Sequence, residues 1–321
     1  MSKQIEVYGN SNSIMKSGWL SFLKVKKQEW DFKNFSIGGS PSPTLLNQSL
    51  LSRAVKRRIA IIEPCVIDHC ETWQDKDELL YYAENTIRFL KKAGPVFVLG
   101  LPRYEKHISS PSQGQRVWQH ASEKLNAIYI DGSALIDSIL SNKRVSLDEI
   151  WIDSSGHFSD VVQESIASKI LEVLEGVSYE QIDTCISNVK FFNILEHDCK
   201  FSSFESFKIK TSLIEEEFLD LSNKEISFDE RFNELALHGI KLNYQYISEA
   251  TSLLHFNGSN VVEYKLYNEF AKNMGKPLVM FKKLYLPLSS DSRLLFKTSS
   301  KDENIQVSSI LMGPRIEKKI S

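Results

Sequence analysis

The first half of the chain alternates short apolar runs with segments of helical period. The apolar runs lie at residues 5–8, 59–62, 96–99 and 127–130, with a weaker candidate at 31–37. Between them, apolar side chains recur at helical spacing, as in Leu80, Ala83, Ile87 and Leu90, and again in Val162, Ile166, Ile170 and Leu174. This alternation is typical of an α/β domain with a mostly parallel sheet, which we predict over residues 1–178.

From residue 179 onward the pattern changes to apolar and alternating segments separated by polar turns. Strands are predicted around residues 201–209, 261–267, 278–281, 294–296 and 305–307. One segment, Ile214 to Leu221, is compatible with a helix. We therefore predict a β-rich second domain over residues 179–321, most simply a sandwich, and consider it a candidate for carbohydrate binding.

Composition narrows the classes of function. The chain has 321 residues and a net charge of −2, so electrostatics gives no argument for binding nucleic acid or an anionic membrane. No apolar run approaches the roughly 18 residues of a membrane span, and no secretory leader precedes the first strand of the sequence as given. The cysteines form no metal or disulfide pattern, being spaced as Cys65, Cys70, Cys185 and Cys199. We expect a cytoplasmic protein with reduced thiols.

The first strand ends at the turn Gly9-Asn10-Ser11-Asn12-Ser13, where a helix is predicted to begin. In an open parallel sheet, ligands bind beyond the carboxyl ends of the strands. A serine at this place is a candidate nucleophile, because the N–H groups of a following helix favour developing negative charge. The same residues are also common helix caps, and the turn alone leaves both interpretations open.

A second polar loop supplies the groups that a serine nucleophile needs. Asp153 and His157 stand four residues apart in a loop that also contains Gly156, immediately before the last helix of the first domain. A serine hydroxyl is activated by a neighbouring base, and that base is oriented by a carboxylate. The aromatic Trp151 flanks this loop.

Together, the G-N-S turn after the first strand, the Gly-Gly turn after the second and the D-x-x-x-H loop before the last helix resemble the SGNH, or GDSL, hydrolase superfamily. The resemblance covers residues 1–178. It implies a flavodoxin-like three-layer α/β/α domain in which Ser11 is the nucleophile, His157 the general base and Asp153 its orienting partner. Members are esterases, lipases, carbohydrate deacetylases and polysaccharide O-acetyltransferases.

The resemblance also implies an oxyanion hole, here from the backbone N–H groups of Ser11 and Gly39, with Gly38 as the second glycine. The family's third donor is an asparagine side chain, but this chain has Ile67 at that position. Isoleucine donates no hydrogen bond, and losing one such donor costs about 3 to 4 kcal/mol of transition-state stabilisation. We count Asn10, Gly38, Asp68 and Trp151 as further candidates for substrate contacts.

The expected reaction is therefore acyl transfer on carbohydrate through an acyl-Ser11 intermediate, by a polysaccharide O-acetyltransferase or an O-acetyl esterase. No tightly bound cofactor and no metal is expected, and a transferase would take acetyl-CoA as its donor. Because Ile67 departs from the family pattern, the alternative is an inactive scaffold that binds glycan or protein.

Overall fold

The computed structural model describes residues 3–39, 41–52, 58–64, 68, 75–142, 145–177, 191–197, 204–210, 215–267, 279–298 and 304–316. The chain forms two compact units, residues 1–189 and 190–321. Residues 178–190 lie outside the described ranges, so the domain boundary near residue 178 stays a prediction. The fold class of both halves is confirmed.

The first unit is built on a parallel sheet. Its described strands are β1 (Gln4–Tyr8), β2 (Asp31–Asn34), β3 (Ile59–Ile62), β4 (Val96–Gly100) and β5 (Ile128–Asp131). They are ordered β2-β1-β3-β4-β5, and in the register Val7 lies opposite Asn34 on one side and Ile61 on the other. This is the flavodoxin-like order, whose switch point lies between β1 and β3. The carboxyl end of β1, where Ser11 follows, is therefore the expected position for a ligand.

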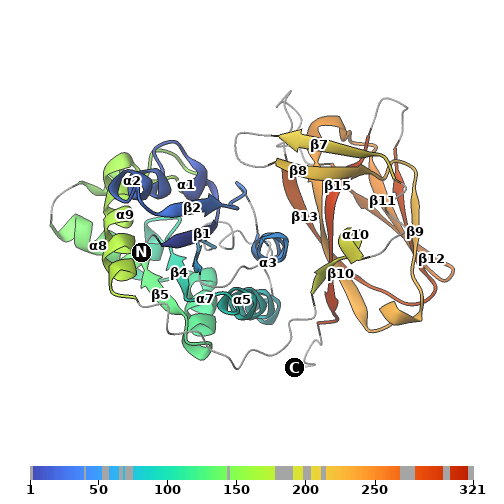
Figure 1. The fold of residues 1–321 in the computed structure, drawn as a ribbon, viewed down its shortest axis with the longest axis horizontal. Coiled ribbons are helices and arrows are strands. Elements are labelled where there is room, and N and C mark those ends of the chain that lie inside the picture. The colour runs from blue at the N-terminus through green and yellow to red at the C-terminus, as the bar shows by residue number, and fades with distance from the viewer. Residues whose placement is uncertain are drawn as a thin grey trace. The chain divides into compact units, whose positions relative to one another are not determined.

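Helices cover both faces of this sheet, giving the predicted three layers (Figure 1). One face carries α2 (Trp19–Lys26), α8 (Gly132–Ser141) and α9 (Asp160–Glu175), and the other carries α3 (Ser42–Leu51), α5 (Lys76–Lys91) and α7 (Gln113–Lys124). The shorter helices are α1 (Ser11–Ile14), α6 (Lys106–Ser109) and the 3₁₀ turn η1 (Leu147–Glu149). The core between sheet and helices is apolar, with Val7, Ile61 and Leu99 fully buried.

The helix expected after Ser11 is shorter than the sequence pattern predicts. α1 ends at Ile14, and a turn containing Gly18 precedes α2. Gly18 is required there, because a Cβ would lie 2.1 Å from the backbone oxygen of Asn12. A helix of one turn has a small dipole. Any anion beside Ser11 would therefore be stabilised by individual N–H groups.

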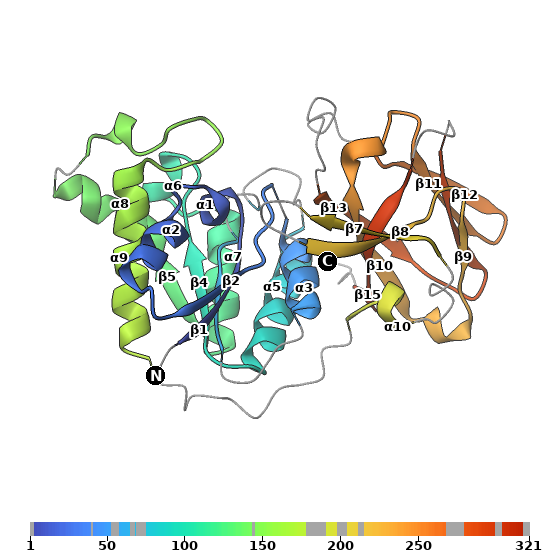
Figure 2. The ribbon, with the colours of Figure 1, turned by 45° about the horizontal axis from the view of Figure 1, so that its top comes forward.

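The second unit consists of antiparallel sheets and is the predicted sandwich (Figure 2). Within the described residues, one sheet has the order β13-β10-β15-β8-β7, with β6 paired to β15, and the other has the order β12-β11-β14-β9. Apolar side chains of both sheets share one core, for example Ile240 and Ile310 with Leu253 and Leu294. The bounds are β6 (Phe192–Asn193), α10 (Ile194–His197), β7 (Ser206–Lys210), β8 (Glu215–Asp220), β9 (Glu225–Ser227), η3 (Glu230–Phe232), β10 (Leu235–Asn243), η4 (Tyr244–Tyr246), β11 (Ser252–Asn257), β12 (Asn260–Lys265), β13 (Val279–Pro287), β14 (Ser292–Lys297) and β15 (Gln306–Pro314).

The prediction of a possible helix between Ile214 and Leu221 is wrong, since Glu215–Asp220 is strand β8. The spacing of Phe218 and Leu221 fits a helix, but β8 pairs with both β7 and β15. Phe218 is fully buried while the adjacent Glu217 is exposed, which is the two-residue alternation of a strand. Ladder hydrogen bonds from two neighbours outweigh a weak local preference.

Two negative findings concern the described residues alone. None of the helices there is long and apolar enough to cross a membrane. No cluster of three or more His, Cys, Asp or Glu side chains in that part of the chain could hold a metal ion.

Candidate active site

The Asp153–His157 loop is closed by its own backbone. Trp151 and Phe158 form an antiparallel bridge, and the N–H of Ile152 donates to the carbonyl of His157 at 2.9 Å. This closure brings Asp153 Oδ2 to 2.5 Å from Nδ1 of His157, while Asp153 Oδ1 accepts the N–H of Ser155 at 2.8 Å. The turn thus accommodates the four-residue spacing between Asp153 and His157, and the two side chains form the expected pair.

The carboxylate of this pair is held in its charged form. Burial tends to raise the pKa of Asp153, but hydrogen bonds from the His157 ring and from the Ser155 N–H outweigh it and leave the pKa below its ordinary value. The side chains of His157 and Asp153 are 25% and 40% exposed. An ionised carboxylate on Nδ1 fixes the imidazole so that Nε2 is the nitrogen left for a second partner.

Asn12 connects this loop to the turn that carries Ser11. Its side-chain amide donates to the carbonyl of Gly156 at 3.2 Å, and its oxygen accepts the N–H of Phe158 at 3.3 Å. The residue after Ser11 therefore holds both neighbours of His157. Gly156 has a φ of +88°, a conformation that favours glycine and that aims its carbonyl at Asn12. Figure 2 shows α1 and the segment leading into α9 at the same end of the parallel sheet.

Ser11 is the first residue of α1 and is half-buried, whereas Ser13 is buried. No hydrogen bond joins the Ser11 hydroxyl to His157 among the described residues. Contacts of this kind are often long without substrate and tighten when it binds. The sequence-predicted nucleophile, base and acid thus lie on two loops that Asn12 joins.

The glycine turn after β2 is packed against the same helix. A Cβ on Gly38 would lie 3.3 Å from Cδ1 of Ile14, and Gly39 has a φ of +67°. Asn34 fixes the approach, since its amide donates to the carbonyl of Ser13 at 3.2 Å. Neither the Ser11 N–H nor the Gly39 N–H donates to another described residue. Both are therefore candidates to receive an oxyanion.

The asparagine side chains near the turn are engaged elsewhere. Asn10 is fully buried and donates to the backbone carbonyl of Glu63 at 3.2 Å, while Asn12 and Asn34 make the contacts given above. Asn10 therefore ties the turn to the backbone that follows β3. Ile67, which stands where the family has its donor, lies outside the described residues.

Two further candidates for substrate contacts occupy different surroundings. Asp68 is buried, and its carboxylate accepts the N–H and hydroxyl of Ser42 and the indole N–H of Trp118 at 2.9 Å. This carboxylate holds the start of α3 and the side of α7. Trp151 is half-buried beside the Asp153–His157 loop, with its ring 5.9 Å from that of Phe158.

Sequence reasoning missed three supporting residues, Asn12, Gln163 and Glu63. Gln163 accepts the N–H of Trp19 at 2.9 Å and donates to Asn12 at 2.8 Å. Gln163 could have been noticed in the sequence as a polar residue among the apolar positions of the last helix of the first domain. Glu63 was detectable as an acid directly after a fully apolar strand. Asn12 gave no signal beyond ordinary turn chemistry.

Glu63 is fully buried and packs against the turn that carries Ser11 and Ser13. Its Oε2 contacts the hydroxyl of Ser13 and accepts the indole N–H of Trp19 at 3.4 Å. Burial raises the pKa of this carboxyl from 4.5 to about 7, although the hydrogen bonds from Ser13 and Trp19 act in the opposite direction. The turn therefore rests on an acid that titrates near neutral pH.

This titration predicts a pH-dependent stability that Glu63→Gln abolishes. Between pH 4.5 and about 7 the folded chain keeps a proton that the unfolded chain releases, so the free energy of unfolding falls as pH rises through this window. Across the whole window, this proton lowers the free energy of unfolding by roughly 3 kcal/mol. Urea unfolding at pH values of about 5 and 8 should show the variant gaining stability over the wild type by this amount.

The matched control is Glu164→Gln, which makes the same change at a side chain that is 54% exposed and paired with Lys26. Exposed ion pairs contribute little, so its stability relative to the wild type should change by less than about 1 kcal/mol over the same range. A pH-independent difference for Glu63→Gln would show that the folded protein carries this carboxyl ionised throughout.

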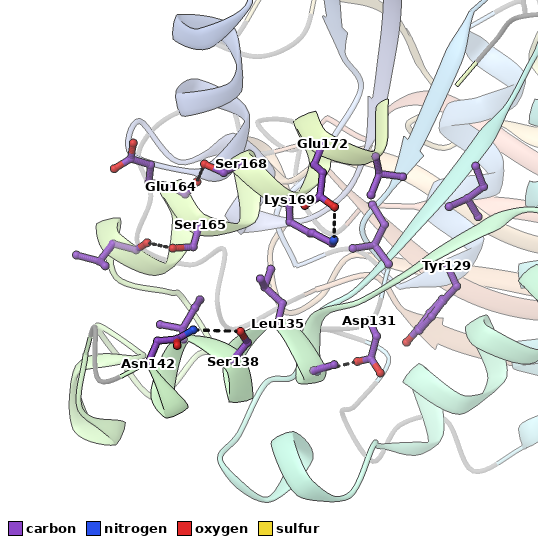
Figure 3. A pocket seen from close by; sticks show the side chains of 16 residues that line it. Tyr129, Asp131, Leu135, Ser138, Asn142, Glu164, Ser165, Ser168, Lys169 and Glu172 are labelled. Atoms are coloured by element: carbon purple, nitrogen blue, oxygen red, sulfur yellow. Dashed lines mark hydrogen bonds and ion pairs between the residues drawn. The ribbon is translucent and has the colours of Figure 1, made fainter. Parts of the chain in front are cut away.

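A cavity in the first unit lies away from the candidate catalytic residues, along the edge strand β5 between α8 and α9 (Figure 3). Its volume is about 800 Å³. Polar side chains on its walls already have partners, since Asp131 caps α8, Lys169 pairs with Glu172 at 2.9 Å, and Asn142 contacts Ser138. Ser11, Asp153 and His157 do not line this cavity.

Comparisons with known proteins bear on the fold. No family model matches the chain, and no curated protein matches it. The chain is similar to the crystal structure of a two-domain esterase active on acetylated mannans, with 12% identity, a TM-score of 0.64, and coverage of 98% of this chain and 92% of that one. This likeness confirms the predicted fold of both units.

Two other similar structures cover about half of this chain. One is a G-D-S-L family lipolytic protein from Veillonella parvula, with 13% identity, a TM-score of 0.47, and coverage of 55% of this chain and 100% of that one. Another is an acetyl xylan esterase, with 16% identity, a TM-score of 0.45, and coverage of 53% and 99%.

Proposed function

We propose that this chain is a serine-dependent carbohydrate O-acetyl esterase that works through an acyl-Ser11 intermediate. The observation that carries the proposal is the Asn12 bridge, which holds the Asp153–His157 pair beside the turn of Ser11. Nucleophile, base and orienting acid are thus gathered at the switch point of a parallel sheet.

In the first half-reaction the Ser11 hydroxyl attacks the ester carbonyl while Nε2 of His157 accepts its proton. Asp153 stabilises the imidazolium that forms, and the N–H groups of Ser11 and Gly39 receive the oxyanion. The intermediate collapses by breaking the bond between the carbonyl carbon and the sugar oxygen, and His157 returns the proton to that oxygen. The products are the deacylated sugar and acyl-Ser11.

In the second half-reaction water attacks acyl-Ser11, and His157 again takes and returns one proton. Free carboxylic acid leaves and Ser11 is restored. With two backbone donors for the oxyanion, turnover is expected to be about 10²- to 10³-fold below that of a site with a third donor.

The substrate class follows from the two-part architecture. The similar esterase that acts on acetylated mannans has both parts, so O-acetylated polysaccharides of this type are the first substrates to test. The β-sandwich unit supplies a second surface for a long glycan.

The test is acetate release from acetylated mannan and from p-nitrophenyl acetate, compared with protein-free controls. Time-dependent release from both supports the esterase. If free CoA appears instead from acetyl-CoA, and only when an unacetylated glycan is present, the acyl group goes to sugar and the protein is an O-acetyltransferase. The absence of turnover with every donor would favour a binding module.

A further inference from the structure

A small hollow adjoins the Asp153–His157 loop. It has a volume of about 440 Å³, within the range of roughly 300–1,000 Å³ that small-molecule sites occupy. Its walls come from the loop after β4, from η1 and from the segment between η1 and α9, namely Arg103, Tyr104, Glu105, Leu147, Asp148, Trp151, Asp153 and Ser154. The orienting acid of the candidate site is therefore part of one wall.

Large apolar side chains are unusually open to solvent on these walls. Tyr104 is 39% exposed and Leu147 is 37% exposed. The Tyr104 ring is held in place, with the Arg103 guanidinium 5.0 Å from its centroid and the His107 ring at 5.4 Å. A fixed aromatic ring with exposed area offers a flat apolar platform.

The hollow also has polar walls. Trp151 contributes to one of them, although its Nε1 is shielded from solvent and is not accessible from the hollow. Arg103, Glu105 and Asp148 add charged donors and acceptors around the same space.

These features point to one class of occupant. A pyranose ring has a face of C–H groups that packs on an aromatic ring and hydroxyls at its edge that pair with guanidinium and carboxylate groups. Asp153 and Ser154 line the hollow while Ser11 and His157 do not. An occupant therefore lies beside the reacting ester and not on it.

We propose that this hollow binds the sugar unit next to the one that carries the ester, so that the protein selects oligosaccharides over single sugars. The inference rests on the proposed function. Tyr104 and Leu147 contact the apolar face of that unit, and the charged groups of the hollow pair with its hydroxyls.

The test separates binding from chemistry by using the Ser11→Ala protein. Partly acetylated mannotetraose is titrated into this variant and into the same variant carrying Tyr104→Ala or Leu147→Ala, with calorimetric detection. Loss of the Tyr104 ring is expected to weaken binding about tenfold, and loss of the Leu147 side chain about fivefold. Ile152→Ala, at an exposed side chain that does not line the hollow, is the matched control and keeps the parent affinity.

A second readout uses active protein. The ratio of kcat/KM for acetylated mannotetraose to that for acetylated mannose should fall about tenfold in Tyr104→Ala. Leu147→Ala changes a different wall of the hollow, so it covers the case in which Tyr104→Ala fails to fold. Unchanged tetraose affinity in both variants, or no binding of tetraose at all, overturns the hollow as a sugar site. Loss of the proposed function has a different signature, namely no acetate release from any ester by the wild type.

Discussion

Replacing Ser11 by alanine is expected to lower kcat for ester hydrolysis by roughly 10⁴- to 10⁶-fold. The serine oxygen forms the covalent bond to the acyl group, and alanine offers no atom in its place. Acetate release from p-nitrophenyl acetate and acetylated mannan would be compared between wild type and variant. Intact-protein mass spectrometry of quenched reactions should find one acetyl group on the wild type and none on the variant.

The control for this prediction is Ser13→Ala, two residues further along the same turn. Ser13 is buried and its hydroxyl contacts Glu63, so its loss should lower stability by about 1 kcal/mol and leave kcat within about tenfold of the wild type. If Ser11→Ala turns over as fast as the wild type, acyl-enzyme chemistry at Ser11 is excluded.

The second large effect is expected from Asp153→Asn, which should lower kcat by roughly 10²- to 10⁴-fold. Asparagine keeps an acceptor for the Ser155 N–H, but its amide would face Nδ1 of His157 in place of the carboxylate. The imidazole would then be held with its proton on Nε2, where it cannot accept the proton of Ser11. The lower part of this range is set by the 40% exposure of Asp153.

Steady-state rates and thermal unfolding of the variant would be measured together, because an intact fold is needed to assign the loss to chemistry. Asp160→Asn removes the same charge from an exposed residue at the start of α9 and should retain full activity. An Asp153→Asn protein that retains most of the wild-type kcat would mean that His157 is oriented by something other than this carboxylate.

The elements that the sequence predicted best are those with a strong local pattern. The run Ile59–Ile62 is β3, and the helical face from Leu80 to Leu90 lies within α5. The spacing of apolar residues shows which side chains are buried together. A spacing of three to four residues places them on one face of a helix, and a short continuous apolar run fits a buried strand. Where the local signal is mixed, as in β8, cross-strand pairing decided the structure, and pairing partners distant in sequence leave no trace in a short window.

The site shows the same division. The types and spacing of Ser11, Asp153 and His157 indicated acyl transfer before any coordinates, because that chemistry needs a nucleophile, a base and an acid. Asp68 and Asn10 were also drawn into the site by their positions in the motif. Both are buried and directed into supporting contacts, a distinction that depends on side-chain direction and is absent from the sequence.

By itself, the sequence determined the α/β and β-rich halves, and it indicated the Ser11 turn and the Asp153–His157 loop as candidates. Each of these depends on residues close together in the chain. The tertiary structure alone decided how the turn and the loop are joined, because Asn12 bonds to Gly156 and Phe158, each more than 140 residues away in sequence. It also decided that Glu63 lies beneath the turn with a raised pKa. Burial and hydrogen-bond partners are properties of three-dimensional surroundings, and these exist only after the strands have assembled.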